Sequence, residues 1–181
     1  DGKWAQGDII TTILTTEFGQ IVRLTLDTTL PRPYSRGLEI HGTKGWFSQD
    51  NMSVYSDDDH KESGHFKWEN FWGNYSQYEE KYMPKLWRDY LEAGIKTGHG
   101  GMDFLVLRGF IEAIKKQTQT PIDVYDTAAW MAITALSEES LAMGGHPVAI
   151  PDFTDGKWIN REPVVEGTYC LEKVCKPGKT L

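Results

Sequence analysis

Cysteine is scarce in this chain of 181 residues, which has only two, Cys170 and Cys175, near its C-terminal end. Two cysteines cannot form a disulfide scaffold, and they cannot supply a four-cysteine zinc site. A local bridge in an oxidising compartment and two thiols in a reducing one are both compatible with their spacing. No motif assigns a role to residues 159–181, which contain both cysteines.

Long hydrophobic runs are also missing, since no apolar stretch approaches the roughly 18 residues that a membrane-spanning helix needs. Residues 1–4 read Asp-Gly-Lys-Trp, without Met and without the apolar segment of a secretory signal. We therefore expect an excised or processed part of a longer protein.

Positive charge is in deficit, because 19 Lys and Arg residues stand against 26 Asp and Glu residues, for a formal net charge of -7. Phosphate backbones and anionic membrane surfaces repel an acidic chain. We expect neither nucleic acid nor a membrane as a partner.

Several motifs of cofactor and nucleophile chemistry are absent. The chain has no phosphate-binding loop of the Gly-x-x-x-x-Gly-Lys type and no Gly-x-Ser-x-Gly elbow. Residues 98–101 (Gly-His-Gly-Gly) are glycine-rich, but no clear strand precedes them, as a dinucleotide fingerprint would require. The remaining histidines, His41, His60, His65 and His146, lack metal-ligand spacing. We expect this chain to bind neither a metal nor a nucleotide cofactor by itself.

Aromatic residues are plentiful, with 7 Trp and 8 Tyr. Their faces suit the apolar C–H faces of sugar rings, although filling a core is the more frequent role of such side chains.

Strand patterns dominate the first half and helix patterns the second. Strands are expected at residues 8–18, 20–29, 37–41, 45–48 and 52–55, with Gly19 at a hairpin turn. Helices are expected at residues 75–90, 103–117 and 123–143, the second capped by Asp103. A stripe of Ala128, Met131, Ala135 and Leu136 would face a core. This order predicts an α+β fold, a mainly antiparallel open β-sheet with helices packed on one face.

Three polar residues are candidates for a site. Tyr34 follows Pro31 and Pro33, in a segment that cannot pair regularly and so can present a side chain, or can simply cover the core. Arg36 suits either a substrate oxygen or a local carboxylate. His99 lies between glycines before a helix, where the helix dipole favours a neutral imidazole that accepts a proton; a structural loop histidine is the alternative.

Five blocks in this order resemble the C-terminal domain of glycoside hydrolase family 109, within the wider Gfo/Idh/MocA group of NAD(P)-dependent oxidoreductases. They are residues 30–37 (Leu-Pro-Arg-Pro-Tyr-Ser-Arg-Gly), 41–45 (His-Gly-Thr-Lys-Gly), 98–103 (Gly-His-Gly-Gly-Met-Asp), 121–126 (Pro-Ile-Asp-Val-Tyr-Asp) and 150–158 (Ile-Pro-Asp-Phe-Thr-Asp-Gly-Lys-Trp). The likeness covers about residues 8–158.

The resemblance implies that residues 1–181 form a single C-terminal domain for substrate binding and oligomerisation, while an N-terminal Rossmann domain that holds NAD lies outside this chain. It implies α-N-acetylgalactosaminidase activity by oxidation at C3, elimination of the aglycone, addition of water and reduction. By resemblance, Tyr34 contacts the substrate and His99 is an active-site neighbour. A homo-oligomer through the sheet face is implied as well, and this domain alone would be inactive.

Two alternatives belong to other classes. The complete protein could be a sugar or polyol dehydrogenase of the same wider group, or the chain could be a carbohydrate-binding or dimerisation module. The resemblance implies a bacterial protein and leaves the cytoplasm and the periplasm open as its location.

Overall fold

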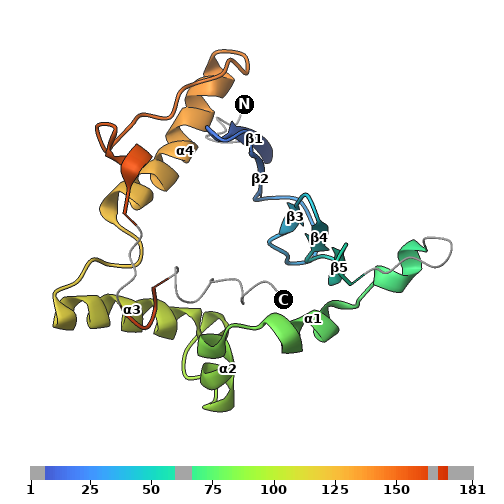
Figure 1. Ribbon diagram of the computed structural model, residues 1–181. Coiled ribbons are helices and arrows are strands. Elements are labelled where there is room, and N and C mark those ends of the chain that lie inside the picture. Colours follow the sequence, from blue (N-terminus) through green and yellow to red (C-terminus); the bar gives the residue numbers. More distant parts are fainter. Residues whose placement is uncertain (1–6, 60–66, 163–166, 171–181) are drawn as a thin grey trace. The chain divides into compact units, whose positions relative to one another are not determined.

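The computed structural model describes residues 7–59, 67–162 and 167–170, which belong to two compact units, Asp1–Tyr78 and Glu79–Leu181 (Figure 1). His60, His65 and Cys175 fall outside the described residues. Across the described ranges, none of the helices is both long enough and apolar enough to cross a membrane.

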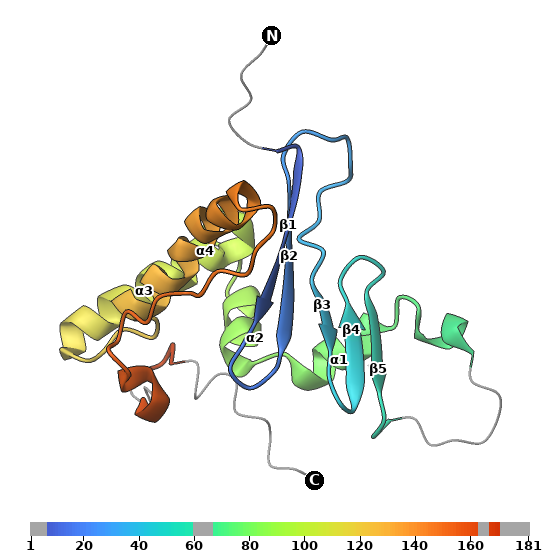
Figure 2. The same cartoon turned by 90° about the horizontal axis from the view of Figure 1, so that it is seen from above.

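The first unit opens with an antiparallel hairpin of β1 (Ile9–Thr15) and β2 (Ile21–Asp27), drawn in blue in Figure 2. Gly19 adopts φ 83° in the connecting turn, a left-handed conformation that glycine takes without strain. The register pairs Ile10 with Leu26 and Leu14 with Val22, so one face of the hairpin is apolar. Both predicted strands and the turn are confirmed.

A second sheet contains β3 (Glu39–His41), β4 (Gly45–Ser48) and β5 (Ser53–Ser56), antiparallel and in chain order (Figure 2). The 3-10 helix η1 (Trp68–Phe71) and the start of α1 (Tyr75–Tyr82) follow it. Ring pairs join these elements, with Phe47 5.7 Å from Tyr75 and Tyr55 5.2 Å from Phe71 between centroids. The Asn74 side chain bonds both the amide and the carbonyl of Val54 at 2.8 Å, which ties this segment to β5.

The second unit is helical. It contains α2 (Lys85–Glu92), the 3-10 turn η2 (His99–Gly101), α3 (Met102–Lys116), α4 (Val124–Ala142) and the 3-10 turn η3 (Lys157–Asn160). One helix was expected over residues 75–90, and this expectation is wrong. Pro84 disfavours helical backbone at Met83 and lacks an amide hydrogen, so α1 ends at Tyr82 and α2 begins at Lys85.

The start of α4 agrees with the sequence pattern. Asp123 is the N-cap, and its carboxylate accepts hydrogen bonds from the amides of Tyr125 and Asp126 at 2.8 and 2.9 Å. The Asp126 carboxylate accepts a hydrogen bond from the Asp123 amide in return, which completes a capping box.

The burial predicted for α4 is wrong. Met131 is exposed, and none of the described α4 side chains is fully buried. Helical periodicity marks a face that is fit for burial, but another surface has to cover that face. The α+β class with antiparallel sheets is nevertheless confirmed, because the described residues form two small sheets followed by four α-helices.

Candidate functional site

The segment between β2 and β3 presents Tyr34 to solvent. This side chain is 89% exposed, so within the described structure it does not cover a core. Ser35 anchors the segment, since its hydroxyl bonds the Asp50 carboxylate and accepts a hydrogen bond from the Gly37 amide at 2.8 Å. Gly37 adopts φ 57°, and Arg36 beside it is exposed. The proline-rich segment therefore displays Tyr34 and Arg36 from an anchored, non-ladder backbone.

In the second unit, His99 is paired with a carboxylate. Its Nδ1 atom lies 2.9 Å from Oδ2 of Asp103. A carboxylate only accepts hydrogen bonds, so the geometry requires the proton on Nδ1. Nε2 is then the ring nitrogen that does not bond Asp103. The His99 side chain is 72% exposed. With Nδ1 on Asp103, Nε2 is the ring nitrogen that could exchange a proton with a bound molecule.

Asp103 had been expected to cap α3, and this expectation is wrong. The N-cap of α3 is Gly101, and no side chain caps the helix there. Asp103 lies in the first turn of α3, four residues after His99, and its carboxylate bonds the imidazole instead.

The turn that carries His99 has an unusual backbone. His99, Gly100 and Gly101 all adopt positive φ, at 52°, 66° and 96°. A non-glycine residue in this region is uncommon and costs conformational free energy. Tyr90 closes the turn from α2: it is buried, and its ring occupies the place that a Cβ atom on Gly101 would take.

These residues do not fit NAD. A dinucleotide site needs a strand that runs into a glycine loop and then a helix, with open backbone for the pyrophosphate. Here the helix α2 precedes the loop, and the Tyr90 ring fills the space beside Gly101. Within the described ranges, no group of three or more His, Cys, Asp or Glu side chains is placed to hold a metal ion.

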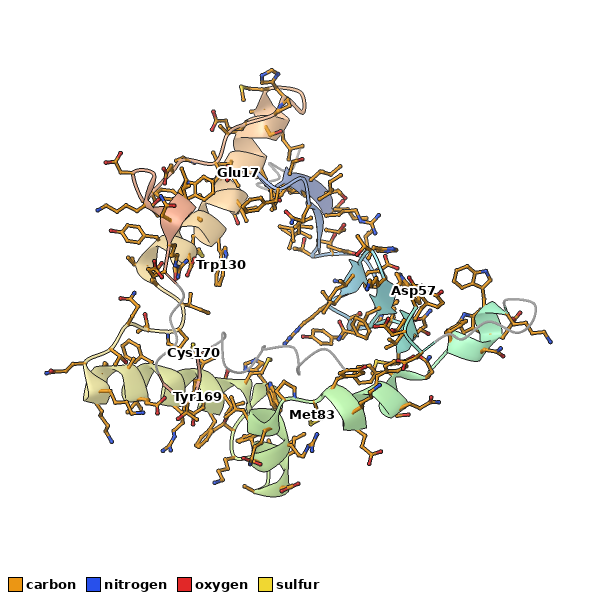
Figure 3. All side chains as sticks on the ribbon, in the orientation of Figure 1. Glu17, Asp57, Met83, Trp130, Tyr169 and Cys170 are labelled. Atoms are coloured by element: carbon orange, nitrogen blue, oxygen red, sulfur yellow. The ribbon has the colours of Figure 1, made fainter. Side chains whose placement is uncertain are left out.

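A short segment near the C-terminal end is fastened to α3, which the sequence did not reveal. Oε1 and Oε2 of Glu112 accept hydrogen bonds from the hydroxyl and the amide of Thr168 at 2.8 and 2.7 Å. Figure 3 shows the neighbouring Tyr169 and Cys170 beside this helix, and Cys170 is only 1% exposed. We call residues 167–170 the clasp. Glu112 and Thr168 are 56 residues apart, so local patterns carry no signal of their contact.

Glu112 is also bonded by Lys116, whose Nζ lies 2.7 Å from Oε1. The Lys116 ammonium and the two Thr168 donors hold the pKa of Glu112 at about 2, below its ordinary value of 4.5. The carboxylate is therefore charged at neutral pH and remains an acceptor for the clasp.

One of the blocks that carry the resemblance, residues 121–126, is joined to Arg161, the residue that follows η3. Arg161 donates to both carboxylate oxygens of Asp126, at 2.6 and 2.9 Å, and lies 3.2 Å from Asp123. The Arg161 guanidinium lowers the pKa of Asp126 below its ordinary value. Upstream, the Asp152 carboxylate accepts hydrogen bonds from the amides of Thr154 and Gly156, which closes the turn before η3. These aspartates act in capping and turns.

An α+β chain with an exposed tyrosine and a histidine–carboxylate pair is compatible with a part of a carbohydrate-active enzyme. Residues 1–160 match the family model described as "Glycosyl hydrolase 109, C-terminal domain", and the chain belongs to this family. It is 43% identical to an alpha-N-acetylgalactosaminidase of Tannerella forsythia, over 87% of this chain and 32% of that protein. It is 41% identical to a glycosyl hydrolase family 109 protein of Stenotrophomonas maltophilia, over 92% of this chain and 36% of that protein.

A further relative is an alpha-N-acetylgalactosaminidase of Shewanella oneidensis, 36% identical over 90% of this chain and 35% of that protein. The chain thus spans about a third of the length of the relatives that it matches. The family assignment confirms the resemblance that the five sequence blocks indicated.

Proposed function

We propose that this chain is the substrate-facing C-terminal domain of an NAD-dependent glycosidase that acts on α-N-acetylgalactosaminides. The observation that carries the proposal is the family match over residues 1–160, together with two relatives that bear the name alpha-N-acetylgalactosaminidase. Because the loop at residues 98–101 lacks the preceding strand and the open backbone of a dinucleotide site, we assign NAD to the part of the longer protein outside this chain. This chain alone is then inactive.

Within the proposed enzyme, Tyr34 is a substrate contact. Its ring and hydroxyl are exposed on an anchored segment, which suits packing against a sugar face and donating to a sugar hydroxyl. Arg36, two residues further on, is a candidate for an oxygen of the substrate.

His99 is the candidate proton acceptor of this chain. Asp103 fixes its tautomer, so Nε2 is the nitrogen that can take a proton from a substrate hydroxyl. The hydride carrier that C3 oxidation requires is supplied by residues outside this chain.

The roles of Tyr34 and His99 are tested in the full-length protein with an aryl α-N-acetylgalactosaminide. We expect Tyr34→Ala to raise KM and His99→Gln to lower kcat by about a hundredfold or more. Phe18→Ala is the matched control, since Phe18 is an equally exposed aromatic residue at the tip of the hairpin. Wild-type kinetics in Tyr34→Ala and His99→Gln would remove both residues from the site.

We further propose that a second copy of the protein covers the apolar face of the β1–β2 hairpin. An isolated two-stranded hairpin is marginal in water, and Val22, Leu24 and Leu26 on this face are exposed. Leu24→Lys is expected to reduce the oligomer to a smaller species in light scattering. Thr25→Lys, on the opposite face, serves as the control, and an unchanged oligomer in Leu24→Lys would reject this interface.

A sugar dehydrogenase is the competing function. It would accumulate NADH in step with sugar consumption, whereas the glycosidase returns the hydride and releases aglycone without net NADH. Titration of NAD into this chain alone tests the assignment of the cofactor, since micromolar binding would contradict it.

A further inference from the structure

Tyr90 of α2 is the most deeply buried aromatic side chain of the described structure, at 6% exposure. Its hydroxyl oxygen accepts a hydrogen bond from the Lys96 amide at 2.9 Å. Its ring stacks on Phe104 of α3 at 5.5 Å and meets Trp87 edge-on at 6.0 Å between centroids. Tyr90 therefore links α2, the following loop and the first turn of α3.

Tyr90 also shapes the turn that carries His99. A Cβ atom on Gly101 would overlap the Tyr90 ring, so the ring and the backbone of Gly101 are in direct contact. Gly101 adopts φ 96° and immediately precedes α3, the helix that carries Asp103. This glycine stands between His99, two residues before it, and Asp103, two residues after it.

We propose that Tyr90 is a positioning residue, which holds the 99–101 turn in its left-handed conformation and thereby keeps the His99 imidazole against Asp103. The inference rests on the proposed function for its catalytic consequence. The proposed effect of Tyr90 on the shape of the turn rests only on the contacts of Tyr90. In this proposal Tyr90 acts on the imidazole through the turn.

Tyr90 contacts the loop through its ring and through its hydroxyl. Ring atoms and the hydroxyl oxygen would all overlap a Cβ atom on Gly101, and the hydroxyl also accepts a hydrogen bond from the Lys96 amide. Tyr90→Phe keeps the ring and should preserve the imidazole–carboxylate pair. Gly101→Ala keeps Tyr90 but forces the ring and the turn apart, so the pair should be lost.

The test uses the full-length protein labelled with ¹⁵N-histidine, and His99→Gln assigns the signal. We expect a downfield Nδ1 proton signal in the wild type and in Tyr90→Phe, and its loss in Gly101→Ala and in Asp103→Asn. Gly94→Ala is the matched control, because Gly94 also has positive φ, at 85°, but open space where its Cβ would lie. It should keep the signal, and thermal melts verify that each variant is folded.

Activity gives the second measurement. Gly101→Ala should lower kcat of aglycone release by roughly ten- to a hundredfold with little change in KM, while Gly94→Ala and Tyr90→Phe stay within threefold of the wild type. A Gly101→Ala protein that keeps the Nδ1 signal would overturn the positioning role. The signal needs no substrate, so failure of the proposed glycosidase activity would be seen separately, as absent turnover in a wild type that still shows the signal.

Discussion

Removing the charge of Glu112 should release the clasp from α3. In Glu112→Gln the side chain keeps one carbonyl oxygen, but it loses the carboxylate that accepts from the Thr168 amide, the Thr168 hydroxyl and Lys116. The substitution changes neither the length nor the shape of the side chain. Its effect therefore reports the charge and the second acceptor oxygen.

The expected magnitude follows from these contacts. Hydrogen bonds to a charged group contribute about 1.5–3 kcal/mol each when they are well desolvated. The Glu112 side chain is 19% exposed, so water screens part of this contribution, and the half-exposed Lys116 partner adds little. We expect the free energy of clasp opening to fall by about 2 kcal/mol, which corresponds to about 30-fold faster exchange when closing is faster than the exchange step.

Hydrogen exchange of the Thr168 amide in the full-length protein measures this opening. Alkylation of Cys170 under reducing conditions, mapped by mass spectrometry, gives a second probe, because this side chain is 1% exposed. Lys116→Gln is the matched control: it removes the exposed partner and leaves both Thr168 bonds, so it should change the exchange rate less than threefold. Equal rates in Glu112→Gln and the wild type, or an equally large effect of Lys116→Gln, would refute the reasoning.

The pH dependence of the clasp has a definite sign. The pKa of Glu112 in the folded protein, about 2, lies below its ordinary value of 4.5. Lys116 is the largest cause of this shift and stays on α3 when the clasp opens, so only the part due to Thr168 stabilises the closed clasp. That part is fully present at neutral pH and is lost as the pH falls toward 2. The clasp-opening equilibrium, measured by hydrogen exchange of the Thr168 amide and corrected for intrinsic exchange, should not change between pH 7 and 5.5. At lower pH, Glu112→Gln should lack the increase in opening that protonation of Glu112 causes in the wild type.

Two further predictions concern the same unit. Gly109→Ala would place a Cβ atom 3.2 Å from Cβ of Tyr169 in the clasp. We therefore expect faster alkylation of the neighbouring Cys170, even though alanine favours the helix itself. Unchanged labelling would show that the clasp accommodates the added Cβ atom without cost. Asp126→Asn weakens the pairing with Arg161, and we expect the melting temperature to fall at pH 7. This difference should shrink as the pH drops below the ordinary pKa of 3.8, because the pKa of Asp126 is lowered in the folded state; a difference that grows as the pH falls would contradict the ion pair.

Local chemistry explains which elements were predictable. The hairpin follows from alternating β-branched residues around Gly19, and α4 begins where Asp123 caps it. Pro84 is a local signal for a break, and it lies inside the single helix that was predicted for residues 75–90.

The site was predictable only in part, because its partners depend on contacts in space. The glycines around His99 mark an unusual turn, whereas Asp103 looked like a cap and proved to be the partner of the imidazole. The contact of Tyr90 with Gly101 links a helix to a loop eleven positions later, and no repeating pattern marks it. Thr168 reaches Glu112 across 56 residues, a distance over which residue type and spacing carry no information.

The central claim is tested most directly with the full-length protein, an aryl α-N-acetylgalactosaminide and NAD, by following aglycone and NADH in the same cuvette. The account predicts release of aglycone over many turnovers without net NADH, with a large loss of rate in His99→Gln. NADH formed in proportion to the sugar consumed, or full activity of residues 1–181 alone, would contradict it.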